Sequence, residues 1–427
     1  MAQNPEQIRQ SLDRYVGPDF RGRLRARGIA RGMVWSHGVV PDGSPRFPET
    51  LSGDLLDFGY VVLALALELR DANVTRAPGE RFRTDDAFEV AAEAIESAVR
   101  RGDPTDGDQG RHLVVASAAF HLAGYAARSF SLLPTTALSK NLASSEKALA
   151  FLLRRGLLEL RALIVGWLGQ EEHSDDAVAK RIEDEDDEFG PEDAVVVALT
   201  TTYLRALGLA DTALLTGDRS RYEAAIATLR ELIRGASAVG NVPVWWVATL
   251  TIHLLGDLWD QCLHNQLPEG PRDDLPERWD GLRRDFIAQL AARSPPHVDL
   301  WPSQLEAARR SIDPADDLVI ALPTSAGKTK IAELCILRTL ADEKRVVYVT
   351  PLRALSAQVE RVLARTFVPL GAAVTSLYGA IGSSSVDEQT LVDADVVVAT
   401  PEKLTSPSAK TRTYSTTWVL SSSMRGT

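Results

Sequence analysis

Two features of the sequence predict an all-α N-terminal region followed by a partial α/β domain with an incomplete parallel sheet. From about residue 50 to residue 290, apolar residues recur at helical spacing in one segment after another. From Asp317 onward, short β-branched runs alternate with helical stretches. Continuous apolar strands separated by helices are typical of a parallel sheet with both faces covered. At 427 residues, the chain is long enough for two or three domains.

The first region is predicted to consist of stacked helical hairpins. No fixed-period consensus relates its helices, so the sequence does not indicate a helical-repeat family. An acidic run at 181–193 interrupts the helices and is expected to be a solvated loop. The segments with the clearest helical period are 85–102, 111–133, 146–169, 221–236 and 242–262.

A change of composition separates the two regions. The segment 264–281 carries three prolines and many charges, and the chain changes character near Ser294–Pro302. We therefore expect a helical domain at 1–295 and an α/β domain at 296–404. The last residues, 405–427, are atypical for either domain.

Four short runs are predicted to be the strands of the sheet. Their β-branched composition and their spacing by helical stretches favour βαβ units. They are DLVIAL at 317–322, KRVVYVT at 344–350, AAVTSLY at 372–378 and ADVVVAT at 394–400.

The first of these strands leads into a predicted phosphate-binding loop, in the stretch LVIALPTSAGKTKIAEL. In such a loop, backbone N–H groups and a helix N-terminus face the phosphates. Gly327 allows the close backbone approach, Lys328 is expected to reach the β- and γ-phosphates, and the Thr329 hydroxyl to ligate Mg²⁺. Leu322 occupies the position where the strict phosphate-binding pattern, G-x-x-x-x-G-K-[ST], has its first glycine. The prediction therefore depends on the strand–loop–helix context rather than on the pattern alone. The predicted ATP-binding residues of the loop are Pro323, Thr324, Ser325, Ala326, Gly327, Lys328 and Thr329.

Two further motifs follow strand ends, where ligands bind in open parallel sheets. TPLRAL begins at Thr350 and TPEKL begins at Thr400. Arg353 and the Thr400 hydroxyl are candidates for sequence-independent phosphate contacts. TPEK also fits a helix start, with Thr400 as N-cap and Pro401 at the first helical position.

Together these motifs resemble the DEAD/DEAH-box helicases of superfamily two, and most closely the large DExH branch. The resemblance covers residues of about 299–404. It implies a RecA-like ATP-binding domain, in which Gln304 is the counterpart of the glutamine that reads adenine. It also implies that PTSAGKT binds ATP and Mg²⁺, while TPLRAL and TPEKL grip RNA or DNA. The nucleic-acid-binding residues implied are Pro351, Arg353, Thr400 and Pro401.

The resemblance also implies parts that this sequence lacks. No Asp-Glu-x-His or Asp-Glu-x-Asp motif follows Leu404, and no second RecA-like domain follows. No catalytic residue is therefore assigned, and efficient ATP turnover is not expected. A one-base frame shift after Leu404 is a hypothesis for the tail. It would recode the serines at 421–423 as a buried strand and the end of the chain as Asp-Glu-Gly-His; a plain Ser/Thr-rich disordered end is the alternative.

Composition indicates the kind of organism and cellular compartment in which the protein works. The net charge of −11 argues against a globally basic nucleic-acid coat, although a local groove can still be basic. The excess of 39 arginines over 8 lysines, with abundant alanine, indicates a GC-rich bacterial genome. With two isolated cysteines, no export signal and no apolar run of about 18 residues, we expect a cytoplasmic protein without a membrane partner.

Other candidate sites are weaker. His253 and His264 flank Cys262 too loosely for a metal site, and the tryptophans at 245, 246 and 259 favour core packing over base stacking.

Three functions remain open from the sequence. The first is the N-terminal part of an ATP-dependent nucleic-acid helicase or translocase. The second is a helical protein-interaction module that docks a protein partner and carries a vestigial P-loop half. A third is another P-loop class, such as a small-molecule kinase, which the motifs at the strand ends disfavour.

Overall fold

The computed structural model divides the chain into two compact units. It describes residues 5–16, 51–72, 81–100, 107–133, 142–183, 190–270, 272–313, 318–320, 327–377, 394–401 and 417–421. One unit, the helical unit, comprises Met1–Thr212 and Arg219–Gly256. The other, the sheet unit, comprises Ala213–Asp218 and Asp257–Thr427. An all-α region therefore precedes a partial α/β domain, as the sequence predicted.

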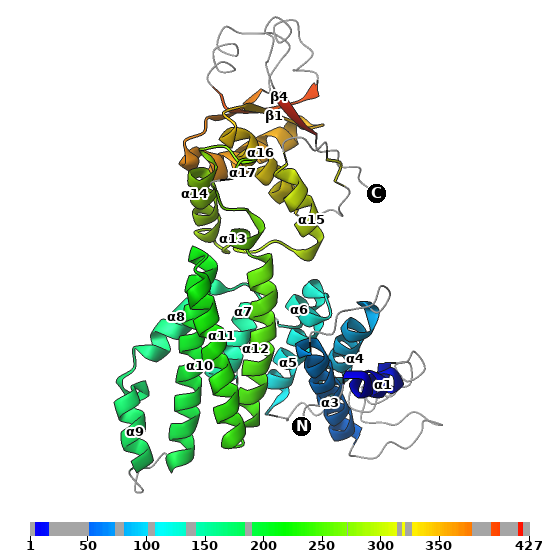
Figure 1. The fold of residues 1–427 in the computed structure, drawn as a ribbon, viewed down its shortest axis with the longest axis vertical. Coiled ribbons are helices and arrows are strands. Elements are labelled where there is room, and N and C mark those ends of the chain that lie inside the picture. The colour runs from blue at the N-terminus through cyan, green and yellow to red at the C-terminus, as the bar shows by residue number, and fades with distance from the viewer. Residues whose placement is uncertain are drawn as a thin grey trace, which may run out of the picture. The chain divides into compact units, whose positions relative to one another are not determined.

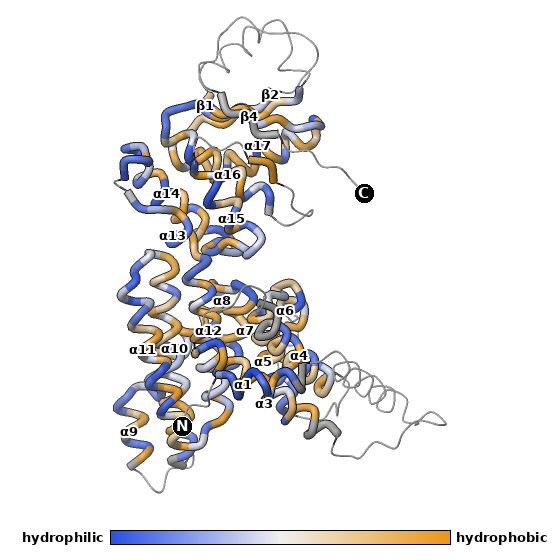
Figure 2. Tube along the Cα trace, turned by 45° about the vertical axis from the view of Figure 1, so that its right-hand side comes forward, coloured by the Kyte–Doolittle hydropathy of each residue, from blue (hydrophilic) through white to orange (hydrophobic). Residues whose placement is uncertain are grey.

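The helical unit packs through small residues. Gly59 of α3 lies so close to α4 that a Cβ there would come within 2.6 Å of Ile95 Cγ1. The hydropathy colouring of Figure 2 alternates along the helices, as expected where each helix buries one face. The helices, seen in Figure 1, are α1 (Pro5–Val16), α3 (Leu51–Asp71), α4 (Arg81–Arg100), α5 (Gln109–Leu122), α6 (Ala126–Leu132), α7 (Ser144–Leu153), α8 (Leu157–Leu168), η2 (Glu171–His173), α9 (Asp175–Glu183), α10 (Gly190–Thr216), α11 (Arg219–Ala238) and α12 (Val242–Gln261).

Two segments predicted as single helices are each broken into two. The segment 111–133 breaks at Gly124, which adopts φ 87°, and the Tyr125 N–H donates to Phe120 O at 2.9 Å. The segment 146–169 breaks at Arg155, which adopts φ 57°, and the Gly156 N–H donates to Phe151 O at 2.8 Å. Both breaks are left-handed C-terminal caps that satisfy the last carbonyls of the first helix.

Helix α10 has the length and composition of a membrane span between Glu192 and Thr216, with 44% of the most apolar window buried inside the protein. A buried core helix passes the same test, so this is weak evidence for a membrane. The tryptophans of α12 pack as predicted: Trp259 is buried, and Trp246 lies 4.9 Å from the Tyr60 ring, centroid to centroid.

The sheet unit contains four parallel strands in the order β2-β3-β1-β4. Helices α14, α16 and α17 lie on one face of this sheet (Figure 1). The connections β2–β3 and β3–β4 fall outside the described residues. The elements are α13 (Leu263–Gln266), α14 (Trp279–Ala291), α15 (Pro302–Ser311), α16 (Lys328–Ala341), β1 (Arg345–Val349), α17 (Arg353–Phe367), η3 (Val368–Leu370), β2 (Val374–Leu377), β3 (Val396–Ala399) and β4 (Thr417–Ser421).

Three of the four predicted strands are present as β1, β2 and β3. The fourth, at 317–322, is not a strand over its described residues 318–320, and Val319 is 94% exposed there. A strand needs a neighbour for its backbone hydrogen bonds, and none of the four described strands pairs with this segment. Strand β4 instead lies in the atypical tail and pairs with β1 from Arg345↔Thr417 to Val349↔Ser421.

The sheet unit begins well before the expected boundary at 295/296. Phe286 of α14 stacks on Phe367 of α17 with ring centroids 6.1 Å apart, and both belong to the core under the sheet. Apolar contact thus joins α14 to the α/β fold rather than to the helices that precede it.

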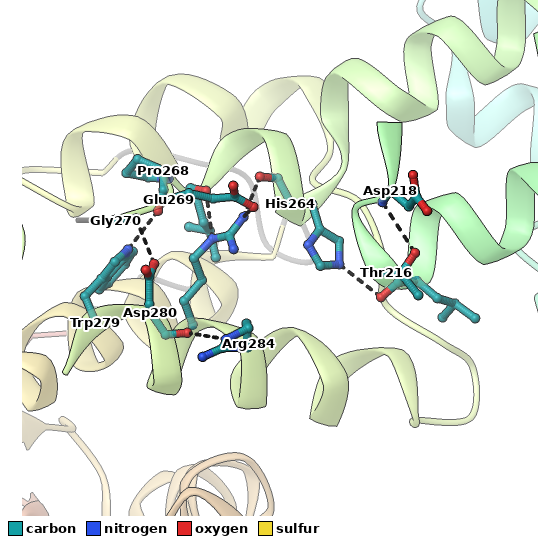
Figure 3. A network of polar contacts seen from close by, with 12 residues as sticks. Thr216, Asp218, His264, Pro268, Glu269, Gly270, Trp279, Asp280 and Arg284 are labelled. Carbon is teal, nitrogen blue, oxygen red and sulfur yellow. Dashed lines mark hydrogen bonds and ion pairs between the residues drawn. The ribbon is translucent and has the colours of Figure 1, made fainter. Parts of the chain in front are cut away.

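A polar network holds the proline-rich segment that the sequence marked as a break (Figure 3). The Arg283 guanidinium, 3% exposed as a side chain, donates to Leu267 O and His264 O at 2.9 and 2.8 Å. The Trp279 indole donates to Pro268 O at 2.8 Å. His264 Nε2 lies 3.0 Å from Leu215 O at the end of α10. Buried donors therefore fix this segment as part of the sheet unit.

Candidate functional site

The N-terminus of α16 is capped by a left-handed glycine. Gly327 is its N-cap and adopts φ 78°, ψ 32°, in the left-handed region that favours glycine. Lys328 begins the helix, and the Thr329 side chain next to it is exposed. The unpaired N–H groups and the dipole of this helix end favour an anion. The loop residues Pro323, Thr324, Ser325 and Ala326 lie outside the described residues.

Gln304, predicted from a motif 23 residues upstream, lies directly against this glycine. Its Oε1 accepts from the Trp301 N–H at 2.9 Å, which caps the start of α15. Its Nε2 donates to Gly327 O at 3.3 Å. A Cβ on Gly327 would lie 1.9 Å from that same Nε2. The structure thus brings together the two predicted nucleotide-binding segments, with Gln304 itself only 5% exposed.

The predicted nucleic-acid motifs lie side by side at one edge of the sheet. β1 and β3 are parallel neighbours with Val349 opposite Ala399, so Thr350 and Thr400 follow at the same edge. The Thr350 N–H donates to Ala399 O at 2.9 Å, which ties the two strand ends together. The expected helix start is present, because a helix begins at Pro401 directly after Thr400.

The side chains at this edge divide into buried threonines and exposed neighbours. The hydroxyls of Thr350 and Ser356 lie 2.5 Å apart and are buried, which fixes the first turn of α17 against β1. Thr400 is 4% exposed. Pro351 and Arg353 are exposed, and Arg353 is the first residue of α17. Of the predicted contacts, Pro351, Arg353 and Pro401 are therefore accessible, while Thr400 is covered.

Sequence reasoning missed a buried charge cluster beneath the candidate nucleotide site. Glu333 of α16, 2% exposed as a side chain, accepts from Lys330 Nζ at 2.5 Å and from Thr366 Oγ1 at 2.7 Å. Arg293 lies 3.6 Å from Glu333 and donates to Thr366. Burial lowers the pKa of Lys330, and Glu333 opposes that shift. The available sequence signal was the second lysine of GKTK, since Lys330 is the third residue of a helix whose following residues are mostly apolar.

The cluster joins three elements. Lys330 and Glu333 belong to the first two turns of α16, Thr366 to the last turn of α17, and Arg293 follows α14. His297 lies close by, and burial, then the charges of Lys330 and Arg293, lower its pKa. Helix α16 is therefore anchored to α17.

The alternative metal site is not formed. In the described part of the chain, no group of three or more His, Cys, Asp or Glu side chains is arranged to hold a metal ion. Cys262 is buried, and burial raises its thiol pKa to about 11. His264 is engaged with Leu215 O.

A glycine-capped helix beside parallel strand ends is typical of nucleotide-binding α/β domains, and comparison with known proteins identifies the family of this segment. Residues 301–420 match the sequence model of the DEAD/DEAH box helicase family. This segment is a DEAD/DEAH-box helicase domain of superfamily two.

Among curated proteins, the chain is similar to Hachiman protein HamB of Bacillus cereus, with 31% identity over 193 residues, 45% of this chain and 17% of that protein. It is also similar to the ATP-dependent DNA helicase Hel308 of Methanocella arvoryzae, with 32% identity over 109 residues, 25% of this chain and 15% of that protein. The matched segments thus span less than a fifth of either relative. The match to HamB is longer than the segment from 301 to 427, so it extends into the region before Trp301.

Proposed function

We propose that this chain binds ATP with Mg²⁺ at the N-terminus of α16 and nucleic acid along the carboxyl ends of β1 and β3, as the N-terminal part of a helicase or translocase. The observation that carries the proposal is the left-handed Gly327, which is held by Gln304 at the start of a helix. The family implies ATP use, and the relatives include a DNA helicase.

The residues at the start of α16 suit an Mg²⁺-bound ATP. The free N–H groups at the start of α16 and the Lys328 ammonium supply positive charge for the β- and γ-phosphates. The exposed Thr329 hydroxyl is available as a Mg²⁺ ligand. Gln304 holds the turn through its bond to Gly327 O; because the side chain is buried and both amide atoms are hydrogen-bonded, it would have to release one partner to read an adenine. Bound Mg²⁺ and ATP would supply the phosphoryl chemistry, and this chain's own residues would hold and orient the nucleotide.

Nucleic acid would contact the adjacent edge. Arg353 stands at the N-terminus of α17, where its guanidinium and the helix dipole both favour phosphate. The Thr350–Ser356 pair holds that helix end in place. Contacts of this kind give affinity without base readout, so the choice between RNA and DNA is left open.

Nucleotide binding tests the proposal directly. Lys328→Ala in the full chain should weaken binding of a fluorescent ATP analogue at least tenfold, because a phosphate loses its charge-assisted partner, worth about 1.5–3 kcal/mol. Lys344→Ala is the matched control, since Lys344 pairs with Asp342 at the other end of the same helix. Equal loss in both variants, or no binding by the unchanged chain, would contradict the assignment.

Binding alone is proposed here, since hydrolysis in this family also needs a carboxylate motif, and residues 405–427 carry no Asp-Glu-x-His. Strand β4, next to β1, supports the proposal that the tail stands at the place of a catalytic strand. The nucleotide sequence of the gene tests the frame-shift hypothesis, which fails if no single-base shift after codon 404 yields Asp-Glu-x-His. Robust ATPase activity of the 427-residue chain stimulated by RNA or DNA would show that its own residues suffice for hydrolysis, and would contradict a function limited to binding.

A second candidate function, docking of a protein partner on the helical unit, is favoured by an exposed apolar stripe on α8. Leu158, Val165 and Leu168 are 46%, 71% and 40% exposed. Val165→Glu in the full chain should abolish any partner that copurifies through this stripe. A partner retained by this variant would place docking elsewhere.

A further inference from the structure

The solvent-facing side of α17 is a row of arginines. Arg353, Arg361 and Arg365 are all exposed, while Ser356, Leu363 and Phe367 are buried; Arg361 and Arg365 face away from these buried residues, and Arg353 lies at the edge between the two sides. At 3.6 residues per turn, the three arginines fall within about 120° of the helix circumference. We call these three residues the arginine ridge.

No acidic side chain offsets the ridge on its own helix. The single carboxylate of α17, Glu360, is half-buried and accepts a hydrogen bond from the Ser376 hydroxyl rather than pairing with an arginine of the ridge. Among the described residues, no ion pair is made by any arginine of the ridge, and Arg361 donates only to Ala357 O on its own helix. The ridge therefore keeps three positive charges in a chain whose net charge is −11.

Exposed arginines elsewhere in the described chain are commonly neutralised. They pair with nearby carboxylates at 2.9–3.3 Å in Arg205–Asp175, Arg219–Glu223, Arg272–Asp274 and Arg278–Glu343. A charged helix face is usually balanced by interspersed opposite charges. The ridge departs from that pattern. Arginines that cluster on one face without opposite charges indicate a surface that binds a polyanion such as nucleic acid.

The ridge is continuous with the proposed nucleic-acid edge. Arg353 begins α17 at the carboxyl end of β1, beside the end of β3. From Arg353 to Arg365 the helix rises about 18 Å. One strand of B-DNA rises about 3.4 Å per nucleotide, so the ridge matches the length of about five phosphates.

We propose that Arg361 and Arg365 extend the nucleic-acid site along the outer face of α17, where they bind the phosphodiester backbone without reading bases. This inference rests on the proposed function and adds two residues outside the TPLRAL motif. Guanidinium groups suit the task, because their planar donors match phosphate oxygens in pairs. Both side chains already face solvent, so binding requires no rearrangement of the sheet unit.

The test is equilibrium binding of labelled single-stranded and duplex DNA of one sequence to the full chain, over a range of salt concentration. The variant is Arg361→Gln with Arg365→Gln. The matched control is Arg230→Gln with Arg234→Gln, two exposed arginines at the same spacing on α11. Arg353→Gln is measured in parallel as the test of the proposed function.

We expect the ridge variant to bind more weakly. The magnitude of the slope of log K against log salt concentration should fall by about 1.8 for duplex DNA or about 1.4 for single strands, the change expected when two phosphate contacts are lost. The control should leave the slope unchanged. If the chain binds DNA and Arg353→Gln weakens it, but the ridge variant does not, the inference fails while the proposed function stands. Single-stranded RNA of the same sequence is measured in parallel, and failure of the unchanged chain to bind both DNA and RNA would overturn both.

An acidic protein partner is the competing occupant. If the ridge variant loses binding of polyglutamate but keeps the DNA affinity and salt slope of the unchanged chain, the ridge is a protein-docking face and the inference is overturned. Because the substituted side chains are exposed, circular dichroism and thermal unfolding of the variant should match those of the unchanged chain.

Discussion

The contact between Gly327 and Gln304 makes a quantitative prediction about Gly327→Ala. An alanine at φ 78° costs about 1–2 kcal/mol for the left-handed backbone alone. Its Cβ would also lie 1.9 Å from Gln304 Nε2, so the buried amide must move. Movement forfeits the bonds to the Trp301 N–H and to Gly327 O, each worth about 0.5–1.5 kcal/mol. The variant should therefore lose about 2–5 kcal/mol of unfolding free energy.

The same geometry predicts strong non-additivity. Gln304→Ala alone removes the two hydrogen bonds and should cost about 1–3 kcal/mol. In the double variant those bonds are already absent and the new methyl group has room, so only the backbone cost is added. The double variant should then be about as stable as Gly327→Ala, about 1–3 kcal/mol better than the sum of the single variants.

Hydrogen exchange of peptides from α15 and α16 in increasing urea follows the sheet unit separately from the helical unit. Gly371→Ala is the matched control: its φ is 85°, but no atom lies within 4 Å of the added Cβ. It should cost only the backbone term and add independently to Gln304→Ala. Additivity of Gly327→Ala and Gln304→Ala within about 0.5 kcal/mol would refute the reasoning.

Three further predictions concern buried charge. Glu333→Gln leaves Lys330 without its buried partner and should destabilise the sheet unit by about 3–5 kcal/mol, whereas exposed Glu306→Gln should change its unfolding free energy by less than about 0.5 kcal/mol. Asp211→Asn, which breaks a pairing with Arg161 at 2.6 and 3.0 Å, should cost about 1.5–3 kcal/mol in urea unfolding; the exposed pairing of Asp175 with Arg205 should be worth under about 1 kcal/mol. Burial lowers the pKa of His253, opposed by Asp71, so the folded state resists the proton that the unfolded state accepts near pH 6.5. The helical unit should thus be most stable above that pH, and should lose up to about 1.4 kcal/mol of unfolding free energy per pH unit as the pH falls toward the folded-state pKa. His253→Gln should flatten this slope. An unchanged slope would exclude His253 as its source.

Local chemistry explains what the sequence predicted well. Gly327, Lys328 and Thr329 are contiguous, and a glycine before a helix-forming run predicts the left-handed cap that the structure has. The strands at 345–349, 374–377 and 396–399 follow from β-branched runs of ordinary length. A period of apolar residues is likewise sufficient to predict the helices, though not the caps at Gly124 and Arg155 that divide two of them.

The remaining features depend on distant partners. Residues 318–320 have an apolar strand composition, yet no described strand pairs with them, because a strand is defined by its neighbour as much as by its own residues. The segment 264–281 has loop composition, yet the buried Arg283 and Trp279 fix it by hydrogen bonds to its carbonyls. Neither outcome can be inferred from a local window.

The sequence by itself determined that an all-α region precedes an α/β part, that a glycine caps α16 and that two motifs follow strand ends, because each is a contiguous run whose backbone preference is local. Tertiary structure alone decided that Gln304 rests on Gly327, that Glu333 ties α16 to α17, and that the arginine ridge faces solvent without a carboxylate beside it. The two contacts join residues up to 33 positions apart in the sequence, and the exposure of the ridge depends on which helix faces the rest of the protein covers. Only packing of the helices on one face of the sheet sets which side chains meet and which remain open to a ligand.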